Sequence, residues 1–81
     1  MAEERIIKFI WDYHGDPAER TAAHHSEHLT EFIEERGLEF GESGFEHING
    51  THHIAYILLK ESDALELKDI LRPHKAVIEK A

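Results

Sequence analysis

The chain has 81 residues, no cysteine and a formal net charge of −8 at pH 7 with histidine neutral. This length fits a single domain over residues 1–81, and the charge excludes the basic surface that nucleic acids and anionic membranes require. The lack of cysteine excludes disulfides and thiolate metal sites, and because no basic leader or membrane-length apolar run is present, we expect a cytoplasmic protein.

Residues 6–13 alternate between two kinds of side chain, which predicts a β-strand. One face is entirely apolar or aromatic and should pack on helices. It consists of Ile7, Phe9, Trp11 and Tyr13. The other face carries Lys8, Asp12 and His14, and we expect it to meet water, a cleft or a partner.

A helix is predicted from Pro17 to about Arg36. Asp16 is the expected N-cap, and Pro17 suits the first helical position. Gly37 is suited to the residue just after the helix, where a left-handed backbone is common. Spacings of three and four residues define a stripe that should be buried. Its members are Ala18, Ala22, His25, Leu29, Phe32 and Ile33.

The dipeptide Asn49-Gly50 predicts a β-hairpin closed by a two-residue type I′ turn. Such a turn fixes the pairing of the two strands that it joins. It would place Phe45, Glu46, His47 and Ile48 opposite Ile54, His53, His52 and Thr51 respectively. His47 and His52 would then form a cross-strand pair.

The hairpin strands are expected at 38–48 and 51–60. Gly41 and Gly44 predict a bulge or a close backbone approach in the first of them. The second strand is apolar on both faces, which predicts a central position in the sheet with cover on two sides.

A second helix is expected at 63–71, with Ser62 as its cap and Arg72-Pro73 at its end. The apolar run 76–78 predicts a fourth strand, although a helix kinked at Pro73 is an alternative. The order β-α-β-β-α-(β) is typical of an antiparallel ferredoxin-like α+β sheet with both helices on one face. We expect a homodimer, since a partner would cover the other face and stabilise so small a domain.

From Asp12 to about Glu61 the chain resembles the YCII-related proteins of the dimeric α+β barrel superfamily. The matching residues are Asp12 or Asp16, Arg20, His28-Leu29, Phe32, Gly37-Leu38, Gly44 and His53-Ile54-Ala55-Tyr56-Ile57. The resemblance implies a homodimer whose sheets pack face to face. It also implies a site that combines the helical histidine, here His28, with an acid near the end of the first strand, here Asp12 or Asp16.

The eight histidines are expected to divide between the two ends of the sheet. We place one group where the first strand ends and the helix begins. It comprises His14, His24, His25, His28 and His74. The other group, at the hairpin turn, comprises His47, His52 and His53.

We expect the first group to form a pocket for a small molecule. His28, His14 and Asp12 would line it, and Trp11 and Tyr13 would shape its walls. Arg72 and His74 flank Pro73 and would reach an anionic ligand.

Three other functions remain open. A cofactor-independent isomerase or lyase would use His28 as general base, oriented by Asp12 or Asp16. A transition-metal protein would bind zinc, nickel, copper or iron through His24 and His28, one helical turn apart, with Asp12, Asp16 or His14 as a third ligand. A structural or regulatory dimer would have no site at all.

Overall fold

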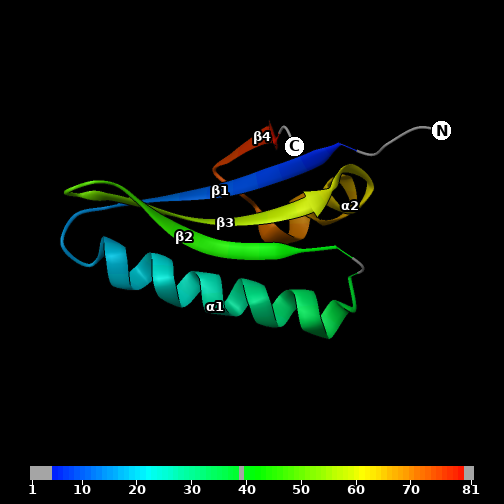
Figure 1. Cartoon of the computed structure of the whole chain (residues 1–81), viewed down its shortest axis with the longest axis horizontal. Helices are drawn as coiled ribbons and strands as arrows, with labels where there is room; N and C mark the ends of the chain where they lie inside the picture. The colour runs from blue at the N-terminus through cyan, green and yellow to red at the C-terminus, as the bar shows by residue number, and fades with distance from the viewer. Residues whose placement is uncertain (1–4, 39, 80–81) are drawn as a thin grey trace.

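Six elements follow one another in the order β-α-β-β-α-β in the computed structural model, which describes residues 5–38 and 40–79 (Figure 1). They are β1 (Ile6–His14), α1 (Ala18–Arg36), β2 (Glu42–Asn49), β3 (His52–Lys60), α2 (Glu61–Leu71) and β4 (Lys75–Glu79). The predicted fourth strand is confirmed, and the alternative of a helix kinked at Pro73 is wrong.

The four strands form one antiparallel sheet in the order β2-β3-β1-β4. This order, together with the sequence of elements, is consistent with the predicted ferredoxin-like α+β fold. Neither described helix is both long and apolar enough to cross a membrane.

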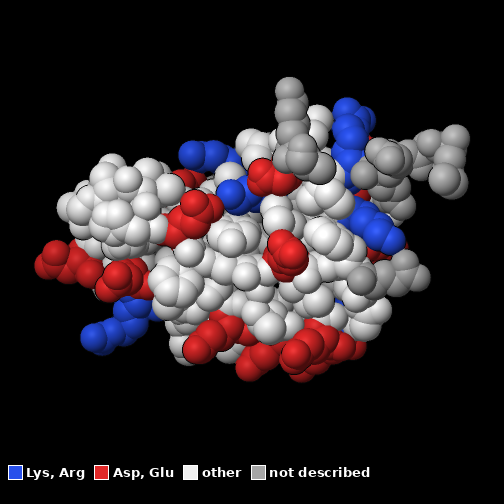
Figure 2. All heavy atoms as spheres, viewed as in Figure 1, with Lys and Arg blue, Asp and Glu red and all other residues white. Residues whose placement is uncertain are grey.

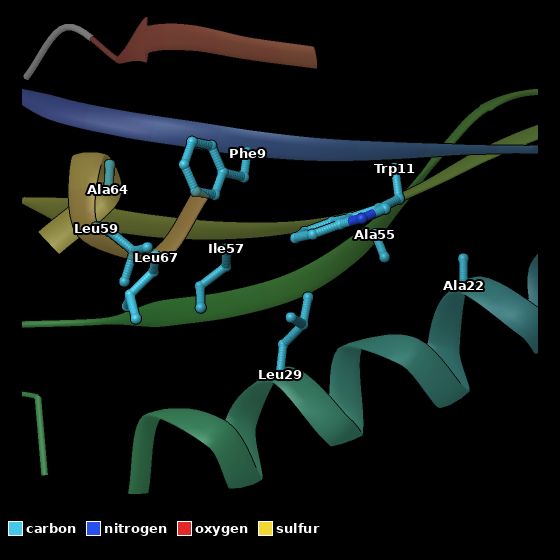
Figure 3. Packing of buried hydrophobic residues seen from close by; sticks show 9 residues of the cluster. All are labelled: Phe9, Trp11, Ala22, Leu29, Ala55, Ile57, Leu59, Ala64 and Leu67. Carbon is cyan, nitrogen blue, oxygen red and sulfur yellow. The ribbon is translucent and has the colours of Figure 1, made fainter. Parts of the chain in front are cut away.

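The hydrophobic core lies between the helices and one face of β1 and β3 (Figure 3). Odd-numbered residues of both strands point into it, as the alternation along β1 predicted. Ile57, Leu59 and Leu67 are less than 2% exposed, and burial of each such side chain contributes about 1.5–3 kcal/mol. The core consists of Phe9, Trp11, Ala22, Leu29, Ala55, Ile57, Leu59, Ala64 and Leu67.

The opposite face of the sheet is only partly covered within one chain. Ile54 is 6% exposed, whereas Tyr56 and Leu58 are half-buried. Neither α1 nor α2, the two helices of the described chain, lies over this face, because both pack on the core side (Figure 1). β3 is therefore central in the sheet, but only its core side is covered within one chain.

Both helix starts differ from the prediction. Pro17 is the N-cap of α1, and no side chain caps the helix. Asp16 is thus wrong as the cap, because a tight turn in which the Ala18 N–H donates to the Gly15 carbonyl delays the helix by one residue. Lys60 is the N-cap of α2 and Ser62 lies inside its first turn, since β3 continues into the helix without a loop.

The end of α1 agrees with the sequence. Gly37 has a left-handed backbone with φ 63°, and its N–H donates to the Glu34 carbonyl. A close backbone approach at Gly44 is also confirmed, since a Cβ there would lie 2.7 Å from the Tyr56 hydroxyl. The bulge itself falls elsewhere, between His47 and Asn49.

The hairpin register is the main error in the predicted fold. Neither Asn49 nor Gly50 has a positive φ, so the turn is not type I′. Instead, the Asn49 side-chain oxygen accepts hydrogen bonds from the N–H groups of Thr51 and His52. Asn49 therefore stays in the strand opposite His52, and Ile48 bulges out. The observed pairs are Phe45 with Ala55, Glu46 with Ile54 and His47 with His53.

Candidate ligand pocket and histidine cluster

The hairpin histidines lie at the same end of the sheet as the end of β1, so the predicted division of the histidines between two ends is wrong. The reason is that β3 runs antiparallel beside β1, so the hairpin turn lies next to the end of β1. His14 pairs with His52, and Tyr13 pairs with His53. The histidines are divided by the faces of the sheet instead.

A pocket of about 480 Å³ opens between the end of β1 and the first half of α1. One wall comes from β1 through Tyr13. The other comes from one face of α1, because its residues recur at intervals of three and four. The lining residues are Tyr13, Arg20, Thr21, His24, His25 and His28.

His25 joins the two walls of this pocket. Its Nδ1 lies 2.7 Å from the Tyr13 hydroxyl, and its ring meets the edge of Trp11 at 4.6 Å between centres. Burial, helped by the nearby His28 and His74, lowers the pKa of His25, while burial raises the pKa of Tyr13. At neutral pH the Tyr13 hydroxyl therefore shares a hydrogen bond with a neutral imidazole.

His24 and His28 form an exposed pair at the rim of the pocket. Their Nε2 atoms are 2.9 Å apart, as expected for side chains one turn apart on a helix. The other ring nitrogen of His28, Nδ1, lies 3.3 Å from the Glu31 carboxylate. The predicted i,i+4 pairing of these two histidines is therefore present in the fold.

The other face of the sheet carries a separate group around Asp12. The His52 Nε2–H donates to Asp12 at 2.8 Å, Lys75 lies 3.5 Å from the same carboxylate, and His14 stacks on His52. Burial would raise the pKa of Asp12, but the His52 hydrogen bond and the charge of Lys75 outweigh it and hold the pKa below its usual value. An ionised Asp12 fixes the His52 ring, which is the arrangement that orients a general base.

The fold does not bring together the predicted set of His28, His14 and Asp12. His28 lies on α1, on the core side of the sheet, whereas Asp12 and His14 belong to the opposite face. Asp12 is engaged with His52 rather than with the helical histidine. Asp16 is exposed beside Arg20, so neither acid orients His28 as the resemblance implied.

Arg72 and His74 have structural partners. The Arg72 carbonyl accepts a hydrogen bond from the Trp11 indole, and the backbone N–H of Asp12 donates to Nδ1 of His74. These contacts attach the chain between α2 and β4 to the end of β1. Trp11 itself is 5% exposed and packs behind the pocket rather than lining it.

A second histidine pair follows from the shifted register. His47 and His53 lie 2.9 Å apart through Nδ1 and Nε2 respectively, in place of the predicted His47–His52 pair. His53 is only 6% exposed, and its Nδ1 has no hydrogen-bond partner among the described residues.

Sequence reasoning missed Arg20, Thr21 and His52 as site residues. The first two share a face with His24 and His28, so helical periodicity alone could have found them. His52 could be found only from the correct register, because its partner Asp12 is 40 residues away.

No group of three or more His, Asp or Glu side chains within residues 5–38 and 40–79 is arranged to hold a metal ion. The three-ligand set of His24, His28 and His14 is therefore not assembled. Comparisons of the chain with protein-family models, curated proteins and solved structures find no match. The resemblance to the YCII-related proteins stays a prediction.

Proposed function

We propose that the protein binds a small organic anion, a carboxylate with a flat apolar body, in the pocket between β1 and α1. The observation that carries the proposal is the chemistry of the lining. It holds one guanidinium, three imidazoles, a phenol and a hydroxyl, and none of the six described lining residues is acidic. In a chain with a net charge of −8, a pocket whose described lining carries no acidic side chain differs from the acidic character of the whole molecule.

The surroundings of the pocket sharpen this contrast. Acidic side chains gather along the solvent side of α1, whereas the tip of the hairpin is free of Lys, Arg, Asp and Glu and has acidic side chains beside it (Figure 2). Asp16 and Glu19 line a neighbouring hollow together with Arg20. Arg20 is the only arginine or lysine in the lining set, which makes it the expected anchor.

Each lining group has a distinct part in this proposal. The planar fork of Arg20 suits the two oxygens of a carboxylate. The rings of Tyr13 and His25, held by their mutual hydrogen bond and inclined at 75° to each other, offer ring surfaces for contact with an apolar body. The His25 imidazole and the Thr21 hydroxyl supply further polar groups.

Backbone amide NMR during titration with benzoate tests the proposal. We expect the largest shifts at residues 20–28 and at Tyr13, and an affinity about tenfold weaker or more in Arg20→Gln, since hydrogen bonds to charged groups contribute about 1.5–3 kcal/mol. Arg36→Gln is the matched control, because it removes the same charge from the other end of α1.

Arg20→Lys separates charge from geometry, since it keeps the charge but loses the fork. An equal loss of affinity in the Arg20 and Arg36 variants would contradict the proposal. Shifts that spread over the sheet without centring on the pocket would do the same.

A further inference from the structure

We infer that His24 and His28 form a two-imidazole binding site for a divalent transition metal ion, with Cu²⁺ or Ni²⁺ as the preferred occupant. The site uses exposed nitrogen atoms at the rim of the pocket. It does not depend on the binding of an organic anion, and its remaining coordination positions are open to water.

The arrangement of the two rings carries this inference. Their Nε2 atoms are 2.9 Å apart, and their centres are 4.6 Å apart with the planes at 71°. In a straight hydrogen bond between two imidazoles with this nitrogen separation, the ring centres would be about 5.2 Å apart, from the ring size and the usual geometry. The contact between the two rings is therefore bent rather than straight, and both Nε2 atoms lie at the exposed rim.

The same distances fit two rings aimed at a common point. Two nitrogens bound about 2.05 Å from one metal ion, at an angle of about 90°, lie about 2.9 Å apart, with ring centres about 4.5 Å apart. A tetrahedral angle would separate the nitrogens by about 3.3 Å. The observed separation is compatible with adjacent corners of a square-planar or octahedral site, a geometry that Cu²⁺ and Ni²⁺ adopt with nitrogen ligands.

Glu31 supplies an independent observation. Its carboxylate lies 3.3 Å from Nδ1 of His28, the ring nitrogen that does not contact His24. This negative charge beside the His28 ring favours a cation at the site. Carboxylates commonly accompany the histidine ligands of metals.

The other two histidine pairs lack one of these features. His14 and His52 stack with their planes at 18°, so lone pairs that lie in the ring planes do not converge. His47 and His53 have a comparable separation, but His53 is 6% exposed and its Nδ1 has no partner among the described residues. Both pairs serve as internal comparisons.

Titration of the untagged protein with Cu²⁺ tests the inference, with quenching of the single tryptophan as the readout. Trp11 contacts His25 edge-on, next to the proposed site. We expect saturable quenching, with affinity reduced at least tenfold in His24→Ala and in His28→Ala. Loss of the carboxylate in Glu31→Gln should weaken binding by about tenfold. Far-UV circular dichroism checks that each variant is folded.

His47→Ala is the matched control, and it should leave the affinity unchanged. Electron paramagnetic resonance of the bound Cu²⁺ should show two imidazole nitrogens in the wild type and fewer in His28→Ala. Arg20→Gln should keep copper binding, so a failure of the proposed anion function is distinguishable. Unchanged affinity in His24→Ala or His28→Ala, or an equal loss in His47→Ala, would overturn the inference.

Discussion

The hydrogen bond between the Tyr13 hydroxyl and His25 joins the two walls of the pocket, and Tyr13→Phe removes it without changing the shape of the ring. The bond is 2.7 Å long, and both residues are half-buried. An unpaired buried acceptor costs about 1–3 kcal/mol. Because His25 is partly solvated, we expect the free energy of unfolding to fall by about 1 kcal/mol, at the lower end of that range.

The loss should be visible in thermal and urea unfolding. For a domain of this size, a loss of about 1 kcal/mol corresponds to a decrease in melting temperature of about 4–8 °C. Tyr56→Phe is the matched control, since it removes a hydroxyl from the other face of the sheet and should change stability by less than about 0.5 kcal/mol.

A double-mutant cycle isolates the contact itself. In a His25→Leu background the hydroxyl of Tyr13 has lost its acceptor, so Tyr13→Phe should then cost close to nothing. If Tyr13→Phe destabilises the His25→Leu variant as much as it destabilises the wild type, the hydrogen bond is not what holds the pocket walls together, and the reasoning fails.

Two further predictions concern pH and assembly. Burial in the folded protein lowers the pKa of His25 below its ordinary value of 6.5, so on acidification the unfolded chain takes up this proton first. The free energy of unfolding should therefore fall as the pH drops below 6.5. In urea titrations, His25→Leu should make this decrease smaller. Light scattering should show a homodimer, since Ile10, Tyr56 and Leu58 lie half-buried on a sheet face that α1 and α2 leave uncovered. Ile10→Glu should give a monomer, whereas Ile70→Glu on α2 should not; a monomeric wild type at micromolar concentration would rule the dimer out.

Local patterns predicted the elements of this fold well. The alternation in β1 identified its core face, and Gly37 marked the end of α1, because both signals depend only on neighbouring residues. The order of elements then restricted the sheet to few arrangements.

The site was predicted less well, because it depends on which strands meet. His24 and His28 face each other within one helix, so their pairing could be read from the sequence. The partner of Asp12 could not, since His52 reaches it only through the pairing of β1 with β3, two strands that are far apart in the sequence. An error of one residue in the register of a strand pair moves a side chain to the other face of the sheet.

The bulge at Ile48 therefore determines which histidines face each other across the hairpin. One extra residue in β2 places His47 opposite His53 instead of His52, and His52 keeps its contact with Asp12 through the pairing of β3 with β1. A related chain whose hairpin is shorter or longer by one residue could keep the same fold and the same histidines, yet exchange their partners. The pairing of the histidines across the hairpin therefore depends on the length of the hairpin more than on the number of histidines in it.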